Sequence, residues 1–355
     1  MKSMKLMTLG YSNVGKTYLL GSLFKLSYDI GSNGFSLQSK VFNETTNIQT
    51  VFGIVSGGDR SAAVVPTTVD IRSSSMVLKK GLNTLFDIEV TDIEGQALEP
   101  GRNVEVAEKI LDKIIEYDGL LLVLEAPQTN TESEIAKQHL GQMLNFAGQA
   151  LSRNEKIPIT LIINKVDRLN KTKDVRRRTD EEIAEIKAEL VRKYPGNLGR
   201  VTKEMRFREG AIVNRYIRDA VNSFEIFDIC ETFFNFIRNT SLPIPCKVFL
   251  STSFGFGCPG TDKIDNYLGE NGLYKPYGSG AAFLWTIYAR LKSQSIGAFD
   301  SDVVGIPLES LTSELLEDIT ELHSKGRSYF DPENNDPDNI WALRNVSNLR
   351  AGVDT

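Results

Sequence analysis

Residues 10–17, Gly-Tyr-Ser-Asn-Val-Gly-Lys-Thr, fit the pattern G-x-x-x-x-G-K-S/T. In such a loop the backbone N–H groups surround phosphate oxygens at the start of a helix, because first-turn amides lack intrahelical partners. The lysine reaches the β- and γ-phosphates, and the threonine hydroxyl ligates Mg²⁺. We therefore expect nucleotide phosphates and Mg²⁺ at this loop. The expected nucleotide contacts are Gly10, Ser12, Asn13, Val14, Gly15, Lys16 and Thr17, with Lys16 also catalytic and Thr17 also a metal ligand.

A second pattern, D-x-x-G, begins at Asp92 and is followed directly by Gln96. Two fixed residues say little alone, but this pattern ends the second strand of a predicted hairpin. There the Asp92 carboxylate can hold the Mg²⁺ shell, and the Gly95 N–H can meet the γ-phosphate. Gln96 is the residue expected to orient an attacking water, which is a catalytic role.

A third pattern, N-K-x-D, comprises Asn164, Lys165 and Asp167, and it follows the apolar run 157–163. A carboxylate can accept hydrogen bonds from both N1–H and the 2-amino group of guanine. Adenine offers no such pair of donors. The pattern therefore predicts a guanine nucleotide.

Alternating strands and helices are expected to position these loops. The run Gly-Leu-Leu-Leu-Val-Leu at 119–124 is typical of a strand buried on both faces of a parallel sheet. Residues 29–66 are expected to be irregular, with one helix at 44–55. The predicted strands are 5–9, 69–78, 85–92, 119–124, 157–163 and 246–251. The predicted helices are 16–28, 103–116, 132–152, 180–194, 209–239, 281–291 and 308–323.

Composition excludes several other chemistries. The 355 residues include 3 Cys, without a C-x-x-C pair, so neither a disulfide framework nor a zinc site is expected. A reducing, cytoplasmic compartment is therefore the expectation. Only two His are present, and both are expected at the surface, which argues against imidazole-based catalysis. No apolar run approaches the roughly 20 residues of a membrane span.

Charge is unevenly distributed along the chain. The 41 Lys and Arg and 46 Asp and Glu give a net charge of -5, but residues 168–218 hold 15 Lys and Arg against 8 Asp and Glu. This segment could bind RNA, the ribosome or another anionic partner. Alternatively, it is a solvated helical insertion whose cations pair with its own glutamates. The sequence leaves both interpretations open.

Taken together, the three patterns resemble the G motifs of the Ras-like, translation-factor-related (TRAFAC) class of P-loop GTPases. The resemblance implies an α/β, three-layer Ras-like fold whose mostly parallel sheet carries one antiparallel hairpin. It also implies hydrolysis of GTP to GDP and phosphate with Mg²⁺, and a conformational switch that an effector or activating protein reads. Hydrolysis is expected to be slow without a partner, since no arginine finger can be assigned.

The resemblance assigns further site residues. A switch I threonine should precede the hairpin, and Thr67 is the first choice to ligate Mg²⁺ and act in catalysis, with Thr68 as the competing candidate. Ser251 and Thr252, after the last core strand, should back the guanine base.

Two long insertions depart from a minimal Ras-like domain. Lys16 and Asp92 are 76 positions apart, against roughly 40 in the minimal domain, and Asp167 and Ser251 are 84 apart. Insertions in both places resemble bacterial GTPases of the double-GTPase type. The expected organisation is a GTPase domain at 1–300, with an extended switch I region at 29–66 and a basic helical insertion at 168–240, then a C-terminal helix and flexible tail at 301–355.

Two alternatives to a switch remain. One is a GTPase-fold binding module that uses residues 168–218 for RNA, the ribosome or another anionic partner. The other is an inactive scaffold, against which the intact Lys16, Thr17, Asp92 and Gln96 argue.

Overall fold

The structure is a computed structural model, and most of the predicted core falls within its described residues. These are residues 2–25, 34–39, 72–93, 112–114, 116–152, 157–169, 175–202, 204–205, 208, 212, 224–240, 244–253, 279–295, 302–303 and 306–324. The predicted helix 44–55 and the tail beyond 324 lie outside them.

A seven-stranded sheet forms the centre of the molecule, in the order β2-β3-β4-β1-β5-β6-β7. Strands β1, β4, β5, β6 and β7 run parallel, whereas β3 is antiparallel to both β2 and β4. The antiparallel β3–β4 hairpin is the one that the sequence predicted. The bounds are β1 Lys2–Leu9, β2 Phe35–Ser39, β3 Arg72–Lys80, β4 Asn83–Asp92, β5 Gly119–Glu125, β6 Ile159–Asn164 and β7 Cys246–Leu250.

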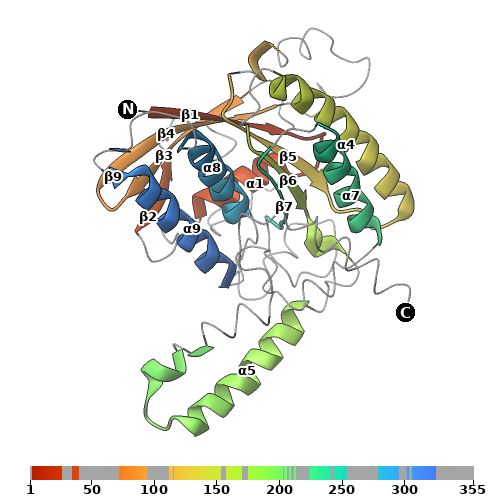
Figure 1. Ribbon diagram of the computed structural model, residues 1–355. Helices are drawn as coiled ribbons and strands as arrows, with labels where there is room; N and C mark the ends of the chain where they lie inside the picture. The colour runs from red at the N-terminus through yellow and green to blue at the C-terminus, as the bar shows by residue number, and fades with distance from the viewer. Residues whose placement is uncertain are drawn as a thin grey trace, which may run out of the picture.

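Helices cover both faces of this sheet (Figure 1). On one face α8 (Ser279–Ser295) packs on β5, β6 and β7 and also contacts α1 (Lys16–Lys25) and α9 (Leu308–Ser324). On the other face α4 (Asn130–Leu151) packs on β5 and against α7 (Phe224–Asn239). The predicted three-layer α/β fold class is therefore confirmed. No helix within the described ranges is both long and apolar enough to cross a membrane.

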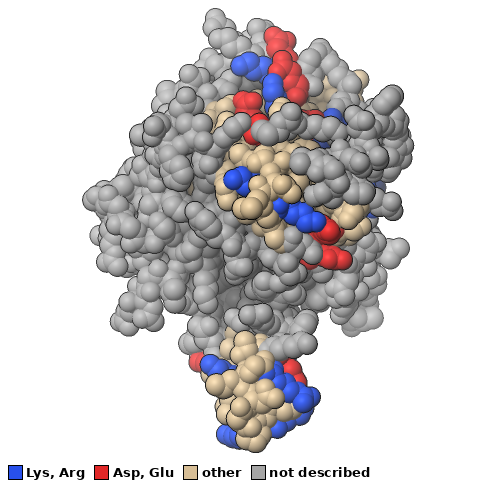
Figure 2. All heavy atoms as spheres, turned by 90° about the vertical axis from the view of Figure 1, so that its left-hand side faces the viewer, with Lys and Arg blue, Asp and Glu red and all other residues tan. Residues whose placement is uncertain are grey.

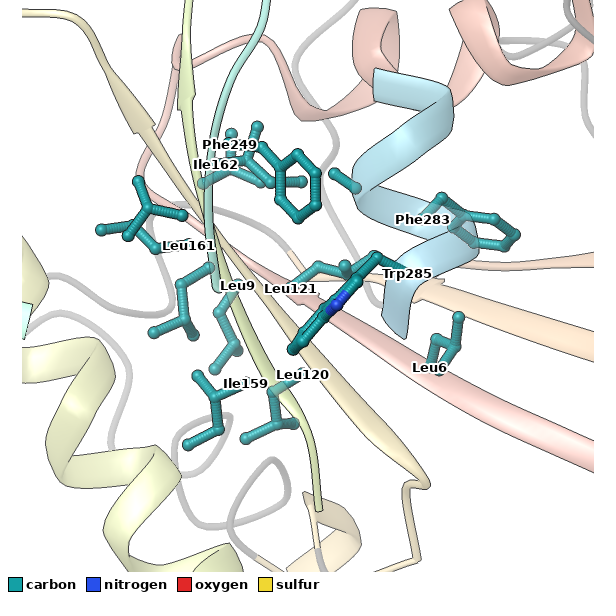
Figure 3. Close-up of a cluster of buried hydrophobic side chains, with 14 of the residues drawn as sticks. Leu6, Leu9, Leu120, Leu121, Ile159, Leu161, Ile162, Phe249, Phe283 and Trp285 are labelled. Atoms are coloured by element: carbon teal, nitrogen blue, oxygen red, sulfur yellow. The ribbon is translucent and has the colours of Figure 1, made fainter. Parts of the chain in front are cut away.

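The core lies where the central strands meet α8 (Figure 3). All five side chains from Leu120 to Leu124 are at most 1% exposed, as expected for a strand covered on both faces. Gly119 permits a close approach of α8, because a Cβ there would lie 2.7 Å from Cγ2 of Thr286. The Thr286 hydroxyl in turn lies 2.6 Å from that of Thr160 in β6, so this buried polar pair is satisfied.

A helical arm extends away from this core (Figure 1). Helix α5 (Val175–Lys193) leads to a turn, after which residues 198–202 are helical again. The arm has its own small apolar cluster of Leu190, Val201 and Met205, separate from the main core. Lys and Arg side chains lie along the lower edge of the arm, with Asp and Glu beside them (Figure 2).

Some element boundaries differ from the sequence expectations. Strand β2 lies inside the segment 29–66 that was expected to be irregular, and it pairs with β3 at the edge of the sheet. Only two side chains of β2, Phe35 and Leu37, are buried apolar ones, so its alternating pattern is too short to read. Helix α5 begins five residues before the predicted start at 180. Residues 209–211 and 213–223 of the predicted helix 209–239 lie outside the described residues.

A matched pair of leucines tests the core assignment. Leu121→Ala in β5, at 1% exposure, should lower the free energy of unfolding by about 2–5 kcal/mol, because it leaves a cavity between two packed layers. Leu82→Ala, in the β3–β4 turn at 100% exposure, should change it by less than about 0.5 kcal/mol. Urea unfolding measures both, and equal effects would contradict the core assignment.

Candidate nucleotide-binding site

The predicted site loops gather at one edge of the sheet. In the parallel registers Thr8 of β1 pairs with Asp92 of β4, and Glu125 of β5 pairs with Asn164 of β6. The carboxyl ends of these strands therefore lie together, and the loops that follow β1, β6 and β7 leave from that edge. In doubly wound α/β folds this edge is where ligands bind.

The shape of the phosphate loop, residues 10–17, depends on particular residues at several positions. Asn13 has φ 66° and Gly15 has φ 88°, both in the left-handed region. Such a turn directs successive backbone N–H groups inward and makes an anion-binding concavity. Gly10 is also required, because a Cβ there would lie 2.7 Å from the carbonyl oxygen of Val123.

Lys16 lies buried within this loop at the start of α1. Its Nζ donates hydrogen bonds to the carbonyl oxygens of Gly10, at 2.7 Å, and Tyr11, at 3.1 Å. These bonds hold the ammonium group beside the concavity, where it adds positive charge to that of the helix N-terminus.

Thr17 and Asp92 provide oxygen atoms suited to Mg²⁺. The Thr17 hydroxyl donates to Asp92 Oδ2 at 3.2 Å, and Asp92 is buried at the end of β4. Mg²⁺ is usually held by one or two protein oxygens together with waters and substrate phosphates. No group of three or more His, Cys, Asp or Glu that could hold a metal is found among the described residues. The hydroxyl and carboxylate at the phosphate loop fit a Mg²⁺ ion that phosphates help to bind.

The N-K-x-D motif is joined directly to the phosphate loop. Asn164 Nδ2 donates to the carbonyl oxygen of Val14 at 2.9 Å, and Lys165 Nζ donates to the carbonyl oxygen of Asn13. A Cβ on Gly15 would lie only 2.7 Å from Asn164 Nδ2. The two loops, with Val14 and Asn164 150 residues apart in sequence, therefore form one continuous surface.

Asp167 is buried beside the loop that follows β7. Burial raises the pKa of its carboxyl above the ordinary value, and a hydrogen bond with the Thr252 side chain opposes that rise. An ionised Asp167 therefore costs folding stability above its raised folded-state pKa, and this cost shrinks as the pH falls from that pKa towards the ordinary pKa of the unfolded chain. A buried carboxyl group that lowers folding stability when ionised is a candidate binding residue.

Several buried polar atoms at this edge have no hydrogen-bond partner within the described part of the chain. Among them are Ser12 Oγ, Asn164 Oδ1, Ser251 Oγ and Ser253 Oγ. Buried polar atoms are normally paired, so atoms of this kind indicate a site that a polar ligand completes.

The structure places most, but not all, of the predicted site residues. The predicted residues that it brings together are Gly10, Ser12, Asn13, Val14, Gly15, Lys16, Thr17, Asp92, Asn164, Lys165, Asp167, Ser251 and Thr252. Thr67, Thr68, Gly95 and Gln96 lie outside the described residues.

One contact at the site escaped the sequence analysis. His139 of α4 was expected at the surface, but it is half-buried and stacks on Tyr11 of the phosphate loop, with ring centroids 3.5 Å apart and an angle of 11°. Nothing local to His139 reveals a partner so distant along the chain.

No family model matches the chain, and no curated protein matches its sequence. Solved structures do resemble it. An SRb-GTP/SRX complex of the signal recognition particle receptor from Chaetomium thermophilum is 15% identical with a TM-score of 0.35, over 76% of this chain and 99% of that one. A septin GTPase domain from Chlamydomonas reinhardtii is 15% identical with a TM-score of 0.26, over 55% of this chain and 63% of that one.

A bacterial selenocysteine-specific elongation factor, EF-Sec, is 17% identical with a TM-score of 0.26, over 53% of this chain. The match covers 24% of that elongation factor, so the matched part of this chain spans about a quarter of its length.

The close approach of the two loops can be tested at Gly15. Gly15→Ala should weaken GDP binding at least tenfold, which is about 1.4 kcal/mol, because the new Cβ would push Asn164 from the loop. Gly81→Ala is the control, since Gly81 also has positive φ, at 59°, but a Cβ there would meet no heavy atom within 4 Å. Isothermal titration calorimetry should find wild-type GDP affinity in the control. Equal losses in both variants would contradict the assigned contact.

Proposed function

We propose that the chain binds a guanine nucleotide with Mg²⁺ and hydrolyses GTP to GDP and phosphate. The observation that carries this proposal is the hydrogen bond from Asn164 Nδ2 to the carbonyl oxygen of Val14. It holds residues 10–17 beside residues 164–167, so one nucleotide could place its phosphates on the first segment and its base on the second.

Asp167 is the residue proposed to select guanine. Its ionised carboxylate would accept hydrogen bonds from N1–H and the 2-amino group, and those bonds would favour the charged form that burial disfavours. Ser251 and Thr252 would support the base from the loop after β7.

The proposed catalytic and metal-binding residues are those expected to lie near the nucleotide's phosphates. Lys16 would donate to the β- and γ-phosphates, and Thr17 and Asp92 would hold the Mg²⁺ shell. When bound, Mg²⁺ neutralises charge on the phosphate oxygens. Thr67 is proposed as a further metal ligand and catalytic residue, Gly95 as a γ-phosphate contact, and Gln96 as the residue that orients the attacking water.

We further propose that nucleotide state switches the conformation around Thr67 and after Asp92, and that an effector or activating protein reads this change. The assignment to the translation-factor-related class, a relation to double-GTPase systems, the division at residue 300 and a cytoplasmic location stay predictions from the sequence.

The projecting arm gives some support to the second candidate function, a binding module for an anionic partner. Lys187, Arg192, Lys193 and Arg200 are exposed on it. However, the Tyr194 ring already lies under Arg200, 4.2 Å from the guanidinium carbon to the ring centroid. That contact argues against base stacking on Tyr194, so GTP binding and hydrolysis remain the better supported function.

Base selection can be tested by Asp167→Asn. The substitution should lower GDP affinity at least a hundredfold and raise affinity for xanthosine diphosphate, because the amide can donate to the extra carbonyl of xanthine. Competition against a fluorescent nucleotide measures both changes, with ADP as the negative control for the wild type. Unchanged GDP affinity in the variant, or wild-type ADP affinity equal to that for GDP, would contradict the proposal.

Hydrolysis can be tested by Gln96→Leu. The variant should release phosphate from GTP at least tenfold more slowly, while its GTP affinity stays within about twofold of the wild type, since a water-orienting side chain acts only in the chemical step. Gln138→Leu, on the exposed side of α4, is the matched control and should leave turnover unchanged. Equal turnover by wild type and Gln96→Leu would remove the catalytic role from Gln96.

A further inference from the structure

Glu125, the last residue of β5, belongs to none of the three nucleotide-binding motifs. Both of its carboxylate oxygens are engaged at the candidate site. Oε2 accepts a hydrogen bond from Lys165 Nζ at 2.9 Å, and Oε1 accepts one from Arg168. Charge-assisted hydrogen bonds to both oxygens of one carboxylate fix its orientation more firmly than a single contact.

Lys165 connects this carboxylate to the phosphate loop. The same Nζ that binds Glu125 also donates to the carbonyl oxygen of Asn13. Among the described residues, Asn13 and Lys165 are also the two non-glycine residues with positive φ, at 66° and 61°. Such backbone conformations persist where surrounding contacts stabilise them. Here the Lys165 side chain binds the Asn13 carbonyl, and Glu125 in turn binds Lys165.

Arg168 links the same carboxylate to the arm. It is the last residue of the short helix η3 (Val166–Arg168), and α5 begins only seven residues further along the chain. Glu125 therefore lies between the base-binding motif and the start of the basic insertion. A shift of the insertion that withdrew Arg168 would leave Glu125 with Lys165 as its remaining cation among the contacts described.

We propose that Glu125 is a positioning residue that holds Lys165 against the phosphate loop and thereby slows nucleotide release. This inference rests on the proposed function, since the nucleotide must span both loops. A ligand that binds two loops stays longer when the loops are already held in their bound arrangement. The Arg168 contact, on the second carboxylate oxygen, adds to that hold.

The experiment is the dissociation rate of a fluorescent GDP analogue, displaced by excess GDP in a stopped-flow instrument. Glu125→Gln should speed dissociation about tenfold at low salt, and less at high salt, because the cluster is about a third exposed and salt screens it. Arg168→Gln should speed it about threefold, since Lys165 keeps its own bond to Glu125.

The matched control is Asp228→Asn, on α7. Asp228 pairs with Lys137 at 2.6 Å with exposed fractions of 25% and 23%, close to the 32% and 24% of Glu125 and Lys165. This ion pair joins α7 to α4, so its loss should leave the dissociation rate unchanged while lowering stability as much as Glu125→Gln does.

A variant that already carries Lys165→Met distinguishes positioning of Lys165 by Glu125 from a general loss of fold stability. If Glu125 acts through Lys165, Glu125→Gln should have no further effect on dissociation in that background. An unchanged dissociation rate in Glu125→Gln would overturn the inference, and so would the same acceleration with and without Lys165. If Glu125→Gln does not fold, an unchanged dissociation rate in Arg168→Gln would overturn it. A wild-type protein that does not bind the GDP analogue would instead overturn the proposed function itself.

Discussion

The hydrogen bond from Asn164 to the carbonyl oxygen of Val14 sets the main constraint on this structure. It can form only if β1 and β6 run parallel on either side of β5, so that both strands deliver their following loops to one edge. It also requires that no Cβ stand at Gly15, where one would meet the Asn164 amide at 2.7 Å. The strand order and Gly15 together allow residues 10–17 and 164–167, which are far apart in the sequence, to form one continuous surface.

The chemistry of the site is placed where the apolar sheet ends. The central strands are almost completely buried, which stabilises the fold, whereas Lys16, Asp92 and Asp167 lie buried at the edge and require charged or polar partners. The raised pKa of Asp167 shows the cost of this arrangement. The apolar packing between the sheet and its helices stabilises the fold. The edge of the sheet carries buried polar groups to which a ligand could hydrogen-bond.

Much of the fold could be predicted because its signals are local. The run in β5 is a continuous apolar stretch, that in β6 is largely apolar, and the apolar spacing of α4 is helical. Both kinds of element could therefore be predicted without knowing their neighbours. Strand β2 was missed because only Phe35 and Leu37 face the core and its pairing with β3 supplies the rest. In α9, Leu311, Leu315 and Ile319 join the main core, a destination that helical spacing alone does not specify.

The sequence by itself identified the candidate residues for phosphate, Mg²⁺ and guanine, because each motif is short and its expected chemistry depends on residue types at fixed spacing. Only the tertiary structure decided that Glu125 bridges Lys165 and Arg168, that His139 stacks on Tyr11, and that Thr252 contacts Asp167. The physical reason is that side-chain contacts between distant segments depend on strand order and register. Those arise from the packing of the whole sheet, and no local pattern encodes them.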